Sequence, residues 1–305
     1  MERRMTSGEV HAELKRLLTE FVTFCDEHDL RYFLAYGSLL GAVREGDFIP
    51  WDDDVDVLMP RPDYERFQDL YAKNAHPSFI LMVPGDTDYP SSFAKLVSAR
   101  TRFESKDHLF PANYGVYLDI FPLDGVPARV PKAHFWAVQE LTVIRHKAYP
   151  KDKPHAVRED PSIPETAKRF VWQVLNQPTH LPAWFKEQNT RLRQKTVGAA
   201  ASKLPRATLA GWAEAVASQF DYEKAGVVAD YFGWTELEDA LIDRAHVDDF
   251  TYVEIDGLQV KTFARPEILL EQWYGDDWQT PQPDFKPPHG EAFWREGHPS
   301  AELPE

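Results

Sequence analysis

The sequence predicts an α+β fold, because short alternating strand runs occur among segments with helical periodicity. Three runs alternate in the way that half-buried strands do: RYFLAYG (31–37), DVDVLM (54–59) and GVYLDIF (115–121). The middle of the chain is instead rich in helix formers with charged faces. The expected parts are, in order, a strand-and-helix core at 1–127, a helical region at 128–240 and a segment at 241–305 that completes the core.

Start and stop signals support the order of these elements. Ser7 is the expected N-cap of an amphipathic helix, and Pro62 stands early in a later helix, where its missing N–H is tolerated. Asp256-Gly257 between two apolar runs predicts a β-hairpin. The expected helices are at 7–29, 38–44, 62–73 and 266–274, with three or four more in the middle region, and the remaining strands are at 79–83 and 93–105.

The composition narrows the functional classes. The chain has 305 residues, of which 43% are hydrophobic, and a formal net charge of −15, which argues against a nucleic-acid partner. Its one cysteine, Cys25, lies in an apolar helical pattern and is expected to be a core thiol, so disulfide frameworks and multi-cysteine zinc sites are excluded. No window is apolar enough to span a membrane, and the expected location is the cytoplasm, with contact at the inner membrane face left open.

The main candidate site is a set of carboxylates. Asp54 and Asp56 are two apart on a predicted strand, so they project from one face, about 6.6 Å apart at the backbone. Few, hard oxygen ligands suit Mg²⁺, with Mn²⁺ as an alternative ion. Asp119, in another apolar strand, is the expected third carboxylate, either as a metal ligand or as the acceptor of a proton from an attacking hydroxyl.

Other groups are candidates for contacts with an anionic ligand. Gly37 and Ser38 stand at a strand-to-helix turn, where free backbone N–H groups favour a phosphate, and Arg44 is about two turns further on. Lys95 either binds phosphate or extends to solvent at a sheet edge. Further possible substrate contacts are Trp51, Asp52, Asp124, Asp276, Asp277 and His289.

Alternative interpretations of the aspartate run fit less well. In a calcium loop that began at Asp52, the sixth position would be Val57 rather than Gly, and the twelfth would be Asp63 rather than Glu. A solvated charge run does not explain the apolar residues that flank the aspartates. P-loop, Rossmann and zincin motifs are absent from the sequence.

With these motifs in place, the chain resembles the LicD family of phosphotransferases, which includes fukutin and fukutin-related protein. The resemblance rests on YGSLLGAVREGDFIPWDDDVDVLMPRPDYERF (36–67), FAKLVSARTRF (93–103), GVYLDIFPLDGVP (115–127) and YGDDWQTP (274–281) with the later His289. It implies a nucleotidyltransferase fold like that of DNA polymerase β, a mixed sheet with flanking helices. Two departures are Glu45, where many members carry a basic residue, and the lack of the cysteines that bind zinc in the fukutin-related branch.

The resemblance also implies roles. Gly37 and Ser38 take the phosphate turn, Asp54 and Asp56 the metal pair, and Asp119 the third carboxylate. The implied reaction moves a phosphorylated alcohol such as phosphocholine, ribitol phosphate or glycerol phosphate from a CDP-activated donor to a sugar hydroxyl of a glycan or lipid-linked acceptor, releasing CMP. Two alternatives remain open: a nucleotidyltransferase that attacks the α-phosphate of a nucleoside triphosphate, and a binding or scaffold protein without activity.

Overall fold

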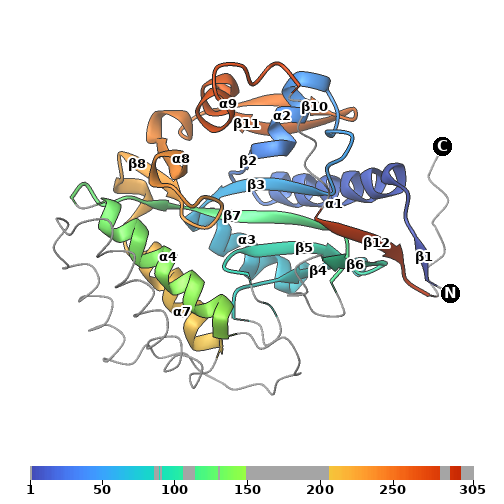
Figure 1. The fold of residues 1–305 in the computed structure, drawn as a ribbon, viewed down its shortest axis with the longest axis horizontal. Coiled ribbons are helices and arrows are strands. Elements are labelled where there is room, and N and C mark those ends of the chain that lie inside the picture. Colours follow the sequence, from blue (N-terminus) through green and yellow to red (C-terminus); the bar gives the residue numbers. More distant parts are fainter. Residues whose placement is uncertain are drawn as a thin grey trace, which may run out of the picture. The chain divides into compact units, whose positions relative to one another are not determined.

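The computed structural model describes residues 2–85, 89, 91–105, 114–129, 131–148, 206–281 and 289–296 (Figure 1). The chain divides into two compact units that are formed by interleaved segments. The first unit comprises Met1–Met82, Phe93–Pro122 and Ile242–Glu305. The second comprises Val83–Ser92 and Leu123–Leu241. The predicted α+β class is confirmed.

The first unit contains most of a sheet whose strands run in the order β2-β3-β7-β5-β4. The last residues of β7, from Leu123 on, belong to the second unit. Strand β7 is the longest and is buried along its whole length, so the sheet is a core element and not a surface ribbon. The strands of this path are β2 (Phe33–Leu34), β3 (Asp54–Pro60), β4 (Phe79–Met82), β5 (Ala94–Ser98) and β7 (Tyr117–Gly125).

A second, three-stranded sheet of the first unit has the order β1-β12-β6, so a strand from the first residues pairs with a strand from the C-terminal segment. Its strands are β1 (Arg3–Arg4), β6 (Thr101–Ser105) and β12 (Gly290–Trp294). The third sheet is the hairpin of β10 (Phe250–Ile255) and β11 (Leu258–Phe263). Its turn residues Asp256 and Gly257 have φ values of 46° and 76°, which confirms the predicted hairpin turn.

Four helices cover the sheets of the first unit: α1 (Ser7–Glu27), α2 (Tyr36–Glu45), α3 (Arg61–Asn74) and α9 (Pro266–Tyr274). The expected N-cap Ser7 is wrong, because Thr6 caps α1 and forms a capping box with Glu9. The apolar face of α1 is fully buried, and Cys25 lies within it as the expected core thiol. The helix predicted at 266–274 is confirmed.

The second unit has its own core, formed by α4 (Pro131–Ala148) and α7 (Arg206–Ala217) with β8 (Val227–Asp230) and α8 (Leu237–Ala240). Buried Phe135, Val138 and Tyr231 belong to this core. Gly125 is required here, because a Cβ would lie 2.7 Å from the carbonyl oxygen of Phe220. The predicted helical character of 128–240 is thus found together with a strand, β8, and residues 149–205 of that prediction lie outside the described residues.

Several predicted boundaries are corrected by tertiary pairing. The strand expected at 31–37 is limited to Phe33–Leu34, since only these residues pair with β3, and α2 begins already at Tyr36. The strand expected at 93–105 is two strands, β5 and β6, which pair with different sheets. The tail contains β12, which the sequence patterns did not predict. The short elements η1 (Tyr222–Lys224), η2 (Arg244–His246) and β9 (Leu241–Asp243) complete the described chain. Among the described helices, none is long and apolar enough to cross a membrane.

Candidate active site

Three carboxylates converge on the neighbouring strands β3 and β7. Asp54 and Asp56 occupy alternate positions of β3, so they share a face, and Asp119 comes from β7. One oxygen atom from each lies within 4.8 Å of the others. Asp54 and Asp119 are buried, and Asp56 is partly buried. This is the convergence that the alternating runs predicted.

The electrostatics of this cluster are unfavourable for three free carboxylates. Burial raises the pKa of Asp54 above its ordinary value. The pKa of Asp56 is raised well above its ordinary value, first by burial and then by the charges of Asp54 and Asp119. Burial likewise raises the pKa of Asp119 to about 6, although Lys95 opposes this shift. The folded protein therefore requires added positive charge to keep all three groups ionised.

Lys95 supplies part of that charge. It lies opposite Asp119 in the β5·β7 pairing, and its Nζ donates a hydrogen bond to Asp119 Oδ1. The ring centroid of Tyr117 is 3.9 Å from the same Nζ. Only 3% of Lys95 is exposed, and β5 lies between β4 and β7, so extension to solvent at a sheet edge is wrong. Its role as a phosphate ligand stays a prediction.

The donor set fits Mg²⁺. Buried carboxylate oxygens are the hard ligands that this ion takes in small number, and one lysine does not balance three carboxylates. Tyr117 Oη donates a hydrogen bond of 3.3 Å to Asp54 Oδ2, which orients that ligand as outer partners of metal ligands commonly do. The sequence analysis missed Tyr117, although it shares the face of Asp119 in the alternating run.

We expect the free energy of unfolding of the metal-free protein to depend on pH because of this cluster. The folded-state pKa of Asp119 is about 6, above its ordinary value of 3.8, so the folded protein binds more protons than the unfolded chain between about pH 4 and pH 6. The contribution of Asp119 to the free energy of unfolding is therefore present below pH 4 and is lost as pH rises to 6. Because Mg²⁺ requires ionised ligands, the gain in Tm that it gives should grow over the same window. Thermal unfolding in EDTA and in Mg²⁺, from pH 4 to pH 8, measures both; a gain that does not change with pH would contradict the site.

The predicted phosphate turn is the first turn of α2. The N-cap residue Ala35 gives no side-chain cap, and Tyr36 adopts a left-handed φ of 51° as the helix begins. Ser38 Oγ accepts a 3.0 Å hydrogen bond from the Asp56 backbone N–H, and therefore joins this turn to the carboxylate strand. A Cβ at Gly37 would lie 3.0 Å from Asp52 Oδ2, so the loop approaches the helix closely at this point. Gly37 and Ser38 are thus within the helix and not before it.

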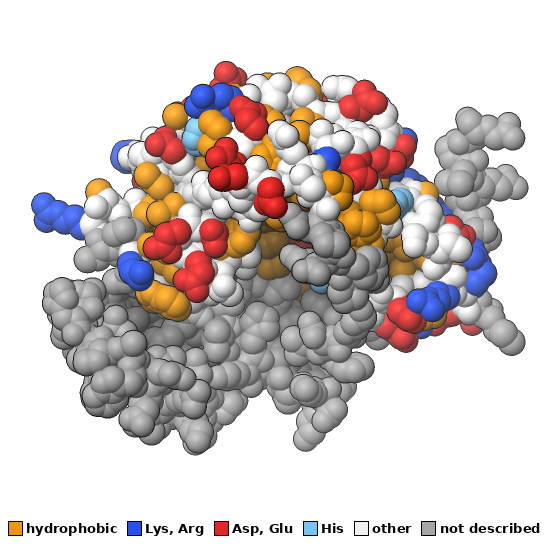
Figure 2. Space-filling view, turned by 45° about the horizontal axis from the view of Figure 1, so that its top comes forward, with side chains coloured by type: hydrophobic (Ala, Val, Ile, Leu, Met, Phe, Trp, Pro, Cys, Tyr) orange, Lys and Arg blue, Asp and Glu red, His pale blue; other side chains and the backbone are white. Residues whose placement is uncertain are grey.

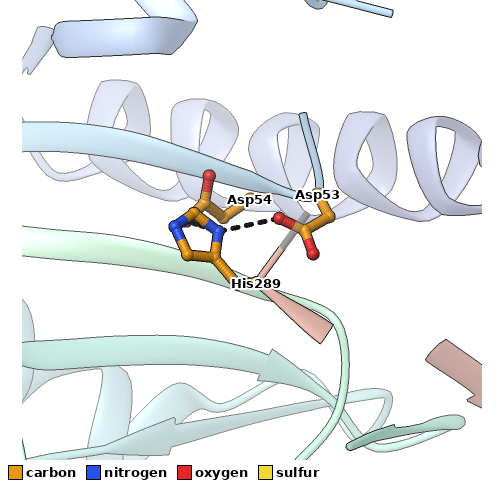
Figure 3. Close-up of side chains that lie close together, drawn as sticks. All are labelled: Asp53, Asp54 and His289. Atoms are coloured by element: carbon orange, nitrogen blue, oxygen red, sulfur yellow. Dashed lines mark hydrogen bonds and ion pairs between the residues drawn. The ribbon is translucent and has the colours of Figure 1, made fainter. Parts of the chain in front are cut away.

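His289 reaches the cluster from the C-terminal segment (Figure 3). Its Nδ1 is 2.8 Å from Asp53 Oδ1 and 3.4 Å from Asp54 Oδ2. The hydrogen bond to Asp53 and the charges of Asp54, Asp53 and Asp119 raise the pKa of His289 to about 9. Asp53 was missed by the sequence analysis, since nothing in the spacing separates it from the other aspartates of WDDDVD.

Comparisons with known proteins show which family and which enzymes this chain is similar to. Residues 29–150 match the model of the LicD/FKTN/FKRP nucleotidyltransferase domain, and this segment holds Asp54, Asp56 and Asp119. Residues 29–150 are thus similar to the LicD family. The domain thus contains the carboxylate cluster and Lys95, whereas His289 lies outside it in the sequence.

The proteins that are similar to this chain include two kinds of transferase. The lipopolysaccharide cholinephosphotransferase LicD of Haemophilus influenzae is 27% identical over 290 residues, which cover 94% of this chain and 97% of that protein. The ribitol 5-phosphate transferases FKRP of Mus musculus and Homo sapiens are each 68% identical over 28 residues, 9% of this chain and 6% of theirs.

Arg44 is another predicted site residue, and it contacts a neighbouring carboxylate. Arg44 Nη2 is 2.7 Å from Glu45 Oε1, and its charge also lowers the pKa of Tyr274, which burial and the charges of Asp56, Asp52 and Asp54 raise. The pKa of the Tyr274 hydroxyl therefore depends on the charges of the carboxylate cluster. That Arg44 binds phosphate stays a prediction.

Three further predicted substrate contacts are Asp276, Asp277 and Asp124. Asp276 and Asp277 are exposed in the segment after α9. Asp124 is fully buried in the second unit, where burial raises the pKa of Tyr231 and the charge of Asp124 raises it further. That these residues contact substrate stays a prediction.

Trp51 and Asp52 line a cavity of about 370 Å³ in the first unit. The cavity also borders Asp53, so it lies on the loop that leads into β3. Its apolar lining residues include Met5, Val10, Trp51 and Phe103. The predicted substrate contact at Trp51 and Asp52 thus has a cavity beside it, and contact itself stays a prediction.

Proposed function

We propose that this protein is an Mg²⁺-dependent phosphotransferase that moves a phosphorylated small alcohol from a CDP-activated donor to a sugar hydroxyl, releasing CMP. The observation that carries the proposal is the convergence of Asp54, Asp56 and Asp119 within a LicD-family domain. A nucleotidyltransferase-like fold for this domain is part of the proposal. The alcohol is choline, ribitol or glycerol, and the acceptor is a cell-surface glycan or its lipid-linked precursor.

The activities named for the relatives support the reaction class. One is a cholinephosphotransferase of lipopolysaccharide and the other a ribitol 5-phosphate transferase. Both names describe transfer of a phosphorylated alcohol. The Haemophilus influenzae relative is a cholinephosphotransferase, and its match covers 94% of this chain. Phosphocholine is therefore the first donor group to test.

The chain's own residues prepare the site for an anionic donor. The described part of the face in Figure 2 carries acidic side chains among hydrophobic and basic ones, and the chain has a formal net charge of −15, so a diphosphate donor needs positive charge at its binding site to offset repulsion. Asp54, Asp56 and Asp119 would hold Mg²⁺, which neutralises phosphate charge and stabilises charge that develops during transfer. Lys95 holds Asp119, and Tyr117 holds Asp54, so the ligands keep fixed orientations. The first turn of α2 offers N–H groups to a phosphate.

The description of the matched family as a nucleotidyltransferase domain favours a second candidate function. The same carboxylates would then serve attack on the α-phosphate of a nucleoside triphosphate, with release of pyrophosphate. The two reactions differ in the nucleotide product, which makes them easy to separate.

The test is a product analysis with defined donors. The protein is incubated in Mg²⁺ with CDP-choline, CDP-ribitol, CDP-glycerol, CTP or ATP, and with deacylated lipopolysaccharide as the acceptor. We expect CMP from one CDP-alcohol, a labelled alcohol phosphate on the saccharide, and loss of both in EDTA. Pyrophosphate from CTP or ATP would establish the second candidate. If calorimetry shows no Mg²⁺-dependent donor binding, the protein is a scaffold protein without this activity. The control is the Glu254→Gln variant, which should stay active because Glu254 is exposed on the hairpin strand β10.

A further inference from the structure

The imidazole of His289 is hydrogen-bonded to Asp53, which is not one of the three converging carboxylates Asp54, Asp56 and Asp119 but forms a second possible metal-binding group with Asp54 and His289. Both oxygens of Asp53 are bound by the C-terminal segment: Oδ1 faces His289 Nδ1 at 2.8 Å, and Oδ2 accepts a 3.1 Å hydrogen bond from the Gly290 N–H. The Asp53 side chain is only 9% exposed. Asp53 therefore fastens two successive residues of the C-terminal segment to the start of β3.

The backbone at this point is independently fixed. Gly290 pairs with Ser105 of β6, and a Cβ at Gly290 would lie 2.2 Å from the Glu104 carbonyl oxygen. The next residues of β12 continue this pairing, and the Met5 N–H donates to the Ala292 carbonyl. Sheet pairing and the Gly290 hydrogen bond thus place the backbone, and the bond from His289 to Asp53 is left to fix the direction of the ring.

The ring itself faces the carboxylate cluster and remains accessible. Figure 3 shows the imidazole beside Asp54, with Nδ1 directed at Asp53. The side chain of His289 is 61% exposed, and Nε2 has no hydrogen bond to any of the residues that the structure describes. Lys95 is committed to Asp119 and Arg44 contacts Glu45, so Nε2 is a nitrogen at the cluster that is open to a ligand.

We propose that Asp53 is a positioning residue that orients His289, so that Nε2 contacts the diphosphate of the donor at the carboxylate cluster. The inference rests on the proposed function and adds two residues to it. A carboxylate that holds the far nitrogen of a functional imidazole fixes the ring orientation and the position of the proton on Nδ1. The C-terminal segment is then part of the active site, although it follows the LicD-family domain in the sequence.

Matched variants separate a substrate contact from a fastening role. His289→Asn keeps a donor near the position of Nδ1 and removes Nε2, so it retains the bond to Asp53. We expect an unchanged Tm and a fall in kcat/KM of about 10- to 100-fold, the range typical of partners next to a metal site. Full activity of His289→Asn would overturn the proposal, because the ring would then serve only as a fastener.

A double-mutant cycle tests whether Asp53 acts through His289. Asp53→Asn alone should lower kcat/KM, whereas Asp53→Asn added to His289→Asn should cause little further loss, because the oriented group is already gone. Losses that multiply in the double variant would overturn the positioning role. If His289→Asn lowers the number of bound Mn²⁺ ions in a metal titration, the ring is a metal ligand, which would also overturn the proposal.

A measurement without turnover keeps this inference separate from the proposed function. In ¹⁵N-histidine NMR of the full chain with Mg²⁺, inorganic pyrophosphate should shift the Nε2 resonance of His289, and the Asp53→Asn variant should show a smaller shift. Pyrophosphate mimics the linked phosphates that a CDP-alcohol and a nucleoside triphosphate both contain. This result therefore does not depend on which reaction occurs. An unshifted Nε2 resonance at saturating pyrophosphate would overturn the contact even in an active transferase.

Discussion

Asp56→Asn is expected to lower transfer by about three orders of magnitude, which corresponds to about 4 kcal/mol at 1.36 kcal/mol per decade. Asn keeps the size of the side chain but removes the charge of one of the three converging carboxylates. The proposed metal site would lose an anionic oxygen ligand, so the charge of a bound phosphate would no longer be balanced. Rates of CMP release with saturating Mg²⁺ measure the effect.

The same variant should be more stable than the parent when metal is absent. Burial and the charges of Asp54 and Asp119 raise the pKa of Asp56, so its carboxyl group costs folding free energy at neutral pH. Asn removes that cost, and Tm in EDTA should rise by a few degrees, on the order of 1 kcal/mol for a chain of this size. Activity that falls together with Tm would indicate misfolding, and a fully active variant would remove Asp56 from the mechanism.

Lys95→Met is expected to destabilise the protein by about 3–5 kcal/mol, the range found when one partner of a buried ion pair is removed. Met fills a similar volume but leaves Asp119 without its counter-charge in a fully paired strand. The pKa of Asp119 should then rise further, because burial would no longer be opposed by Lys95. Denaturant unfolding at pH 7.5 in EDTA measures the loss.

The second-site variant Lys95→Met/Asp119→Asn should recover most of this stability, since neither partner is charged, but it should remain inactive. Lys15→Met is the matched control, because Lys15 pairs with Asp256 at the surface, where both side chains are more than a third exposed. We expect a change below about 0.5 kcal/mol there. If Lys95→Met is as stable as Lys15→Met, the buried pair does not hold the cluster together.

Local patterns predicted the elements that depend on neighbouring residues. The helix at Pro266–Tyr274, the hairpin turn at Asp256-Gly257 and the strand that begins at Asp54 follow from capping, turn and alternation signals that act over a few residues. Boundaries set by distant pairing were harder to predict. β12 exists because β6 and β1 pair with it, and β2 is short because β3 accepts only two of its residues.

The site divides in the same way. Alternation placed Asp54 and Asp56 on one face, and Asp119 was singled out as a carboxylate in a mostly apolar strand. Nothing in the spacing indicated that Lys95 would lie opposite Asp119 instead of at an edge, because that depends on the order of strands in the sheet. Asp53 looked like one more aspartate until the C-terminal segment was found against it.

The sequence by itself determined an α+β chain with carboxylates in the alternating pattern that suits a divalent ion, and it predicts a phosphate-binding turn at Gly37 and Ser38. These features are encoded within short stretches, where side-chain period and residue type are sufficient. Only the tertiary structure decided which groups pair with these carboxylates, and that His289 joins them from more than 200 residues away in sequence. Such choices depend on burial and on strand pairing between distant segments, and local sequence does not specify either.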